Sequence, residues 1–363
     1  MGKIKILFVF RTPMENIGLI NDEKVSEPSE FLWGMKDLDR TKYEVRFINA
    51  PRFGKRTGIR RFTWFFEVAF AKYTRIGLPL DIYLKYRKDL LWADEIVCTY
   101  DQVSVGILFW RLCGALKGKK IHAIVMSFSE RIKYFEHIQP LRWFVSALLR
   151  QANSILTLSE VASDTLALKF KLDRKKIYTW YFGIDTSFWV QERHDVIYNI
   201  MSIGNDMNRD FATLIGALRY DEKAVFITNK HVEYDQEKKY ITILSGISNA
   251  EVRTCYSQST IVVIPSFPLQ TESSGLSCVL QALACGRPVI VSDAPPFREL
   301  FEDEIHCLFY TPGSVEDLRK KIDLLKNNED LAKKIAIQGH KLVLERYTCK
   351  VMSDQLNYIL KLS

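Results

Sequence analysis

The stretch from Ile261 to Glu299 constrains the fold of this chain more than any other part of its sequence. It starts with four apolar residues followed by a proline, the pattern of a parallel strand that is buried on both faces. A polar loop comes next, then apolar residues at helical spacing over 276–284, and after Gly286 a second apolar run at 289–292. This order predicts a strand, loop, helix, strand unit. At the start of such a helix, free N–H groups and the helix dipole favour a phosphate, so we predict a nucleotide-type ligand.

The rest of the chain alternates strand-like runs with helical segments in two blocks. With 363 residues, of which 47% are hydrophobic, the chain is long enough for two α/β domains that each bury a core. The first block starts with an apolar run at 4–10 and continues with a helix predicted over 26–38, and the second block starts with a strand at 196–203. Such alternation predicts doubly wound parallel sheets, with a linker near 183–194.

Charge is distributed unevenly along the chain. Residues 1–180 carry a net charge of +12 and residues 181–363 a net charge of −4. The first half could therefore contact an anionic partner, or it could simply have a solvated basic surface. No run approaches the roughly 18 apolar residues of a membrane span, and the first residues lack a signal-peptide cleavage region, so we expect a cytoplasmic protein. Neither cysteines nor histidines occur in pairs with metal-ligand spacing, and no metal site is predicted.

Basic and aromatic residues are interleaved between residues 51 and 88, where the net charge is +8. Arg56, Arg60 and Arg61 precede Trp64 and several phenylalanines. This composition suits an interfacial helix on an anionic membrane, with rings at the level of the headgroups. It also suits a nucleic-acid groove. A third interpretation is that the aromatic side chains belong to the core and the basic ones are solvated.

Several motifs resemble those of the retaining, GT-B-fold glycosyltransferases of family four. They are Pro265-Ser266, Glu272, Gly275-Leu276, the heptapeptide at 284–290, Glu299, Leu158-Ser159-Glu160, Gly183-Ile184-Asp185 and Ser202-Ile203-Gly204. The resemblance implies an α/β GT-B fold of two facing Rossmann-like domains. Residues 1–188 would be the acceptor-side domain, joined by a C-terminal helix at 350–363, and residues 189–349 would bind the nucleotide-sugar.

The resemblance also implies an activity. Such enzymes transfer a hexose with retention of configuration from a nucleotide-sugar, here a UDP- or GDP-sugar, with no cofactor and no metal. The acceptor would be a lipid-linked glycan or polysaccharide precursor at the cytoplasmic membrane face. Two alternatives stay open: a sugar transferase that acts on DNA, which the basic first half would also fit, and an inactive module that binds a sugar.

The family binds the donor's diphosphate with an Arg/Lys pair, because charge on this leaving group grows during transfer. Asn205 replaces the usual arginine after Gly204, so Arg209, at the lysine position, is the predicted phosphate cation. Alternatively, Arg209 pairs with Asp206 or Asp210 on a solvated loop. Lys230 is predicted to lie beside the nucleotide. Backbone N–H groups at the helix start would hold the distal phosphate; they belong to Ser274, Gly275, Leu276 and Ser277. Ser273, just before them, is also predicted to bind the nucleotide-sugar.

Two acids contact the donor in the family. Glu272 matches the first acid, which would hold the sugar's hydroxyls and stabilise positive charge on the sugar ring in an oxocarbenium-like transition state. Gln281 takes the place of the second, one residue further along than usual, and could still hydrogen-bond a ribose. Glu299 follows two prolines where the family has glycines, and it is also predicted to contact the nucleotide-sugar.

The N-terminal half departs further from the family. Many members place a histidine at the end of the strand that corresponds to 121–126, whereas this chain has Ser127 or Phe128 there. His122 lies at the other end of the strand and is predicted to be a hydrogen-bonded strand residue. Asp101 would either face the acceptor or cap a helix.

Overall fold

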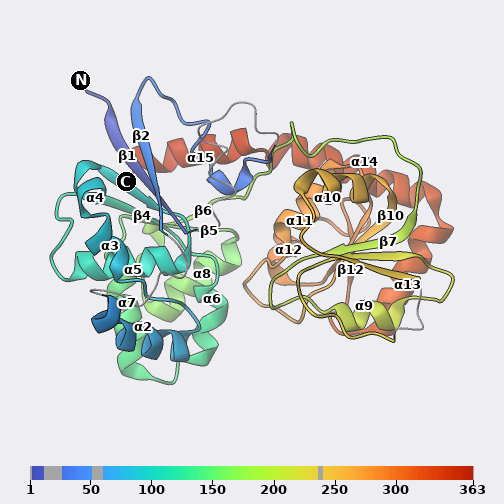
Figure 1. The fold of residues 1–363 in the computed structure, drawn as a ribbon, viewed down its shortest axis with the longest axis horizontal. Coiled ribbons are helices and arrows are strands. Elements are labelled where there is room, and N and C mark those ends of the chain that lie inside the picture. Colours follow the sequence, from blue (N-terminus) through green and yellow to red (C-terminus); the bar gives the residue numbers. More distant parts are fainter. Residues whose placement is uncertain (1, 12–26, 51–59, 236–239, 363) are drawn as a thin grey trace. The chain divides into compact units, whose positions relative to one another are not determined.

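The computed structural model describes residues 2–11, 27–50, 60–235 and 240–362, without the side chains of residues 60–62. Within these ranges the chain forms two compact units (Figure 1). Unit 1 comprises Met1–Val25, Phe31–Tyr181 and Met352–Ser363, and unit 2 comprises Ser26–Glu30 and Phe182–Val351. The main division lies between Tyr181 and Phe182, whereas the sequence placed it after residue 188.

Unit 1 is built on a six-stranded sheet in the order β2-β1-β3-β4-β5-β6, with every pair parallel. Strand β1 lies between β2 and β3, and its last five residues are apolar and buried, as a strand covered on both faces requires. The strands are β1 (Ile4–Phe10), β2 (Tyr43–Asn49), β3 (Glu95–Cys98), β4 (Lys120–Ile124), β5 (Ser154–Thr157) and β6 (Ile177–Thr179).

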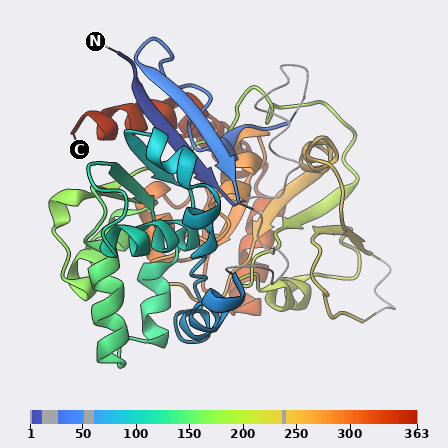
Figure 2. The same ribbon diagram turned by 60° about the vertical axis from the view of Figure 1, so that its left-hand side comes forward.

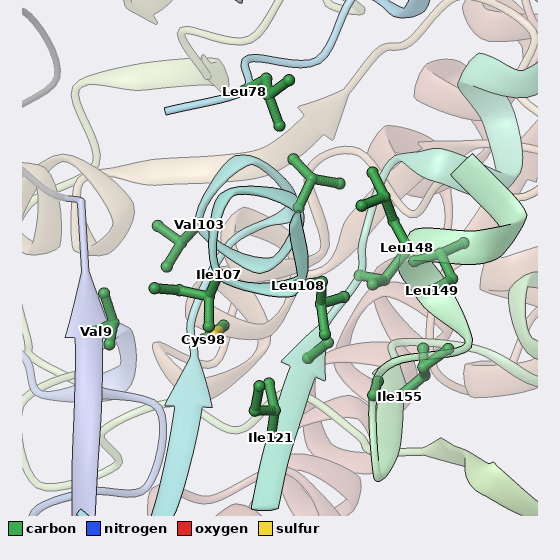
Figure 3. Close-up of a cluster of buried hydrophobic side chains, with 14 of the residues drawn as sticks. Val9, Leu78, Cys98, Val103, Ile107, Leu108, Ile121, Leu148, Leu149 and Ile155 are labelled. Carbon is green, nitrogen blue, oxygen red and sulfur yellow. The ribbon is translucent and has the colours of Figure 1, made fainter. Parts of the chain in front are cut away.

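Helices cover the sheet of unit 1. They are α2 (Arg60–Thr74), α3 (Asp81–Lys85), α4 (Arg87–Trp92), α5 (Asp101–Leu112), α6 (Phe128–Arg131), α7 (Gln139–Leu149) and α8 (Glu160–Phe170). Figure 3 shows α5 end-on, with Cys98 and Ile121 of the strands on one side and Leu78 on the other. The helix α15 (Cys349–Leu362) returns to this unit, where Trp180 Nε1 donates a hydrogen bond to the Met352 carbonyl over 2.8 Å (Figures 1 and 2).

The helix that was predicted over 26–38 is wrong for the described residues. From residue 27 onward, only Glu30–Leu32 is helical, as a single 3-10 turn. The chain turns sharply just after it, because Trp33 and Gly34 both adopt positive φ angles of 54° and 70°. Left-handed residues end a helix, and Gly34 can adopt this conformation at little cost because it has no side chain.

Unit 2 contains a second all-parallel sheet, in the order β12-β11-β10-β7-β8-β9. Chain order reverses between β7 and β10, so this is the switch point at which open α/β sheets bind ligands beyond the carboxyl ends of their strands. The strands are β7 (Tyr198–Ile203), β8 (Ala224–Ile227), β9 (Ile241–Leu244), β10 (Ser259–Ile264), β11 (Val289–Ser292) and β12 (Leu308–Tyr310).

The helices of unit 2 include one that the sequence predicted residue for residue, α11 (Leu276–Ala284), between β10 and β11. The others are α9 (Phe211–Ala217), α10 (Asn249–Ser257), α12 (Pro295–Leu300), α13 (Val315–Asn327) and α14 (Glu329–Arg346). In the part of the chain that the structure describes, no helix combines the length and apolar character that crossing a bilayer requires.

A buried ion-pair cluster fastens α13 to the turn between α9 and β8. Glu222 has no exposed surface, and its carboxylate accepts from Arg319 Nη1 and Lys326 Nζ, each at 2.6 Å. Burial raises the pKa of Glu222, but hydrogen bonds from Arg319, the Arg219 backbone and Lys326 outweigh it and bring the pKa down to about 2. The charged form is therefore the one that the folded state stabilises.

We predict that Glu222→Gln lowers the free energy of unfolding by about 3 kcal/mol at pH 7, the equivalent of the pKa shift. Because the folded-state pKa is depressed, this stabilisation is present above the unfolded pKa and declines as pH falls from about 4.5 towards 2. Urea denaturation of the unsubstituted protein and of Glu222→Gln, at pH 7 and at pH 3, measures this difference in the free energy of unfolding. Glu316→Gln is the control, since this exposed α13 residue also pairs with a lysine. Equal effects of the two substitutions would contradict the prediction.

Candidate functional site

Two loops meet at the switch point of unit 2. The loop after β7 spans 204–210 and the loop after β10 spans 265–275. They are joined by backbone hydrogen bonds, since Asp210 N donates to the Pro265 carbonyl over 3.2 Å and Phe267 N donates to the Asn208 carbonyl over 2.9 Å. The sequence predicted a phosphate at the start of the helix after the second loop, and a phosphate cation, Arg209, in the first. The structure shows that the two form one continuous surface at the carboxyl ends of neighbouring strands.

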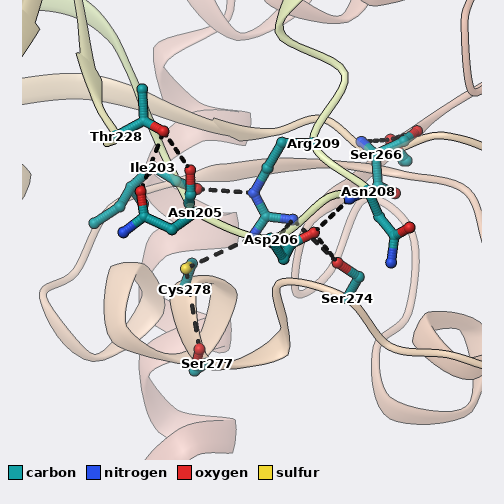
Figure 4. Close-up of polar contacts among 12 residues, drawn as sticks. Ile203, Asn205, Asp206, Asn208, Arg209, Thr228, Ser266, Ser274, Ser277 and Cys278 are labelled. Carbon is teal, nitrogen blue, oxygen red and sulfur yellow. Dashed lines mark hydrogen bonds and ion pairs between the residues drawn. The ribbon is translucent and has the colours of Figure 1, made fainter. Parts of the chain in front are cut away.

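Arg209 lies at the centre of this arrangement (Figure 4). Its side chain is only 1% exposed, and its Nε donates to the Ile203 carbonyl over 2.9 Å. Nη1 contacts Asp206 Oδ2 at 3.0 Å and Ser274 Oγ at 3.4 Å, and Nη2 reaches Cys278 Sγ at 3.7 Å. Arg209 thus pairs with Asp206, as the alternative interpretation proposed, but it does so as a buried group rather than on a solvated loop.

Two glycines make room for the guanidinium. A Cβ at Gly204 would lie 2.1 Å from Arg209 Nε, and a Cβ at Gly275 would lie 2.7 Å from Arg209 Nη2. Gly275 also has a φ of 95°, which disfavours any residue with a side chain. Both glycines of the predicted nucleotide-sugar site therefore allow Arg209 to approach the two loops.

Asp206 supplies the anion that faces Arg209. One of its oxygens accepts from Ser274 Oγ at 2.6 Å and from Asn208 N at 2.9 Å, and the other pairs with Arg209. Lys230 adds a second cation, because its Nζ donates to the Asp206 carbonyl over 3.1 Å. The Asp206 side chain is 38% exposed, so this carboxylate stands between the buried guanidinium and solvent. Its donors are of the kinds that a bound phosphate would use.

The side chain of Asn205 stabilises the loop after β7 through hydrogen bonds. Its Oδ1 accepts from Asn229 N at 2.6 Å and from Thr228 Oγ1 at 3.2 Å, and Thr228 Oγ1 also contacts the Gly204 carbonyl (Figure 4). These bonds tie the end of β7 to the end of β8. Asn205 thus fixes the loop, and Arg209 and Lys230 are the cations that the structure brings to this corner.

The start of α11 contributes backbone donors next to Arg209. Gly275 is the residue just before the helix, and Leu276 N is already bonded to the Ser273 carbonyl at 3.1 Å. The other amides of the first turn have no partner within the helix, as at any helix N-terminus, and Ser277 is partly exposed there. Glu272, also partly exposed, accepts from Asn208 Nδ2 at 3.4 Å. The roles assigned to these residues remain predictions.

Gln281 lies in a buried cluster that the sequence did not indicate. Its Nε2 donates to Glu30 Oε1 over 3.0 Å, and Tyr256 donates its hydroxyl to Gln281 Oε1 over 3.4 Å. Trp189 Nε1 is a further donor to Glu30, at 2.9 Å. Burial raises the pKa of Glu30 above its usual value, although these hydrogen bonds act against the rise. Gln281 keeps one N–H and one lone pair for a ribose, and that role stays a prediction.

Glu299 is an exposed residue of α12 that lines a separate groove of about 710 Å³. Pro268, Asp293 and Thr311 line the same groove, which therefore lies beyond the carboxyl ends of β10, β11 and β12. Arg298 beside it pairs with Asp293 through two contacts of 2.7 Å. The groove lies at the same edge of the sheet as the loops around Arg209, and the contact of Glu299 with a nucleotide-sugar stays a prediction.

In unit 1, Asp101 neither caps a helix nor faces solvent. It is the first residue of α5 and is 8% exposed, and its carboxylate accepts from Met126 N and Ser127 N, both at 3.1 Å. Burial raises the pKa of Asp101, and the hydrogen bonds from Ser127 and Met126 counteract it. Asp101 thus connects the ends of β3 and β4 and fixes the backbone of Ser127. The helix-cap alternative is therefore wrong, and the place of Asp101 on the acceptor side stays a prediction.

His122 is a hydrogen-bonded strand residue, as predicted. Its Nδ1 lies 2.7 Å from Ser154 Oγ and its Nε2 lies 3.1 Å from Glu95 Oε2. Arg56 lies outside the described residues, and the side chains of Arg60 and Arg61 are also outside them, whereas Trp64 is a partly buried residue of α2. Within the described ranges, no three His, Cys, Asp or Glu side chains gather closely enough to bind a metal ion.

Comparison with known proteins shows what parts of this chain are similar to. Residues 206–357 match the family model described as glycosyl transferase-like. A curated relative is the O-antigen chain mannosyltransferase RfbU of Salmonella typhimurium, which is 25% identical over 203 residues. The alignment covers 52% of this chain, and the chain spans 55% of that relative's length.

Similar solved structures extend over nearly the whole chain. HepE of Anabaena in complex with UDP-glucose has a TM-score of 0.72 at 12% identity, and the match covers 99% of this chain and 100% of that one. Sucrose-phosphate synthase of Thermosynechococcus elongatus has a TM-score of 0.73 at 14% identity, with 99% of both chains covered. A glycosyltransferase of Rickettsia africae has a TM-score of 0.63 at 16% identity over the full length of both. Together with the two all-parallel sheets, these likenesses show that the chain has the GT-B fold of two Rossmann-like domains.

Proposed function

We propose that the protein is a retaining glycosyltransferase that moves a hexose from a nucleotide-sugar to a glycan or lipid-linked precursor. The observation that carries the proposal is the cationic corner at the switch point of unit 2, formed by Arg209, Lys230 and the start of α11. The glycosyl transferase-like family model over 206–357 and the similarity to a mannosyltransferase support it. HepE, which has the same fold, was solved with UDP-glucose.

In this proposal the donor's diphosphate binds where Asp206 now accepts hydrogen bonds. Arg209 Nη1, Ser274 Oγ and the Lys230 ammonium are donors for phosphate oxygens, and the first-turn amides of α11 add the favourable end of a helix dipole. For the phosphate to reach the guanidinium, the Asp206 carboxylate has to turn towards solvent. When the bond from sugar to phosphate breaks, these groups stabilise the charge that grows on the leaving diphosphate.

Glu272 is the proposed partner of the sugar. Its carboxylate would hold hydroxyls of the donor hexose and stabilise positive charge on the ring during transfer. Asn208, which donates to Glu272 over 3.4 Å and belongs to the loop of Arg209, would help to orient it. Sugar and phosphate would then be held by two loops that share backbone hydrogen bonds. Retention follows from the resemblance to family four and is tested by the anomeric configuration of the product.

The donor is tested by a thermal-shift panel of UDP-, GDP-, ADP-, CMP- and dTDP-sugars. A ligand at 100 times its Kd stabilises the fold that binds it by about 2.7 kcal/mol, which corresponds to several degrees in Tm. We expect one base to give such a shift, followed by slow hydrolysis of that nucleotide-sugar in the absence of acceptor. Binding without any hydrolysis or transfer would instead support an inactive sugar-binding module. The absence of any shift across the panel would contradict the proposal.

A further inference from the structure

A large apolar cavity lies within unit 1, apart from the loops described above. Its volume is about 980 Å³, at the upper end of the roughly 300–1,000 Å³ that small-molecule sites occupy. It lies between α2, α5, α7 and the segment before α3, and six of the residues that line it are Ala69, Phe70, Leu80, Phe109, Leu141 and Phe144. Close-packed protein interiors rarely leave apolar space of this size.

The polar atoms of two lining side chains already have partners. Trp110 Nε1 donates to the Leu80 carbonyl over 2.9 Å, and Thr63 Oγ1 donates to Glu67 Oε1 over 2.8 Å. A polar ligand would therefore lose hydrogen bonds to water and gain few inside this cavity. A hydrocarbon chain makes no hydrogen bonds that it could lose on entering the cavity. Its binding is favoured because apolar surface is removed from water.

The opening of the cavity can be identified from lining residues that remain exposed. Phe66 and Tyr73 of α2 line the cavity but are 65% and 47% exposed, and Pro140 at the start of α7 is also exposed. Lys72 lies over the Tyr73 ring, with its Nζ 5.8 Å from the ring centroid. Arg142 follows Pro140 after two residues. Two exposed aromatic rings and the ammonium group of Lys72 thus lie at the opening, and Phe144 connects the cavity to the groove that Arg142 lines.

Arg142 also begins a second, basic groove of about 490 Å³ along the other side of α7. Arg150, Lys169 and Lys171 line this groove too, and Phe144 lines both the groove and the cavity. Among the described residues that line the groove, none is acidic, although Glu136 reaches in to pair with Lys169 at 2.8 Å. An anion at the opening near Pro140 would therefore be attracted along a line of cations.

We propose that unit 1 binds a single lipid that carries a phosphate headgroup, with its hydrocarbon chain in the apolar cavity and its phosphate on the basic groove at Arg142. The apolar lining selects the chain, and the adjoining positive charge selects the headgroup. The evidence for this lipid site is the cavity and the groove alone, and it does not depend on the proposed transferase function. The further statement that its lipid carries the sugar acceptor rests on the function proposed above.

Isothermal titration calorimetry with hexyl, octyl and decyl phosphate, below their micellar concentrations, tests the site. If each methylene is buried in the cavity, affinity rises about fourfold per methylene. Decyl maltoside, with a neutral headgroup, should bind at least tenfold more weakly than decyl phosphate. Inorganic phosphate should bind too weakly to measure. An affinity that does not change with chain length, or that is equal for the two headgroups, would overturn the proposal.

Matched variants locate the site. Ala69→Phe fills the cavity and should abolish the dependence on chain length, whereas Val68→Phe adds the same ring at an adjacent position of α2 that does not line the cavity, and should preserve it. Arg142→Gln should weaken decyl phosphate binding at least fivefold, and Lys175→Gln, an exposed residue outside the groove, should not. Equal effects of Ala69→Phe and Val68→Phe, or of Arg142→Gln and Lys175→Gln, would overturn the assignment. A protein that binds anionic vesicles but none of the alkyl phosphates would also overturn it. No nucleotide-sugar is present in these titrations, so their failure is distinguishable from failure of the proposed transferase activity.

Discussion

Replacing Arg209 by methionine is expected to lower kcat/KM for the nucleotide-sugar by about 10²–10³, the usual effect of removing one preorganised donor from a developing anion. The guanidinium is buried, and contacts with Ile203, Asp206 and Cys278 fix its position. Binding of a phosphate therefore costs little free energy for reorganising this side chain. Methionine fills similar space without charge. Initial rates of donor hydrolysis or transfer measure the change, and circular dichroism verifies the fold.

Two further variants separate this role from a structural one. Arg219→Met removes an exposed arginine that pairs with Asp323 at 2.8 Å, and should leave the rate unchanged. Asp206→Asn removes the carboxylate that competes with phosphate for Arg209, so donor affinity should stay the same or rise. If Asp206→Asn reduced activity as much as Arg209→Met, the arginine would be a partner of Asp206 and not a phosphate ligand.

Gly275→Ala is expected to reduce donor turnover without any change to a charged group, because its Cβ would collide with Arg209 Nη2 at 2.7 Å and with Ile264 Cγ2 at the same distance. Gly313→Ala is a matched control. Gly313 has a similar φ of 80°, but a Cβ there would meet nothing within 4 Å. Both substitutions carry the backbone cost of a left-handed residue, about 1–2 kcal/mol. Only Gly275→Ala should displace Arg209.

Glu272→Gln is expected to lower kcat by about 10²–10³ with a much smaller change in the donor's KM. Glutamine preserves size and hydrogen bonding to sugar hydroxyls but loses the negative charge that stabilises a positive ring in the transition state. Single-turnover measurements at saturating donor separate this effect from binding. Glu345→Gln, at an exposed position of α14, is the control. An unchanged kcat in Glu272→Gln would remove this residue from the mechanism.

The fold class was predictable because its signal is local. Four apolar residues before Pro265, and helical spacing over 276–284, identify β10 and α11 without reference to any other part of the chain. The same periodicity predicted the strand and helix alternation that becomes two parallel sheets. It failed after residue 27, where a proline in the first turn and apolar residues behind it predict a helix, but the left-handed Trp33 and Gly34 end it after a single 3-10 turn.

Individual contacts were predictable only in part. The pairing of Arg209 with Asp206 joins residues three apart, and was among the sequence alternatives. Nothing near Gln281 indicates Glu30, which is 251 residues away and reaches it only because Ser26–Glu30 belongs to unit 2. Asp101 has a helix-cap pattern, but β3 and β4 are neighbours in the sheet, and this brings the amides of Met126 and Ser127 within reach of its carboxylate.

By itself, the sequence determined two α/β domains and the two loops at which a nucleotide-sugar is predicted to bind, because backbone conformation follows from the order of apolar, polar and glycine residues along the chain. Only the tertiary structure decided that strand order reverses between β7 and β10, that Arg209 is buried between two glycines, and that α2, α5 and α7 leave an apolar cavity. These features depend on how side chains distant in sequence share space and hydrogen bonds, which periodicity along one segment does not encode.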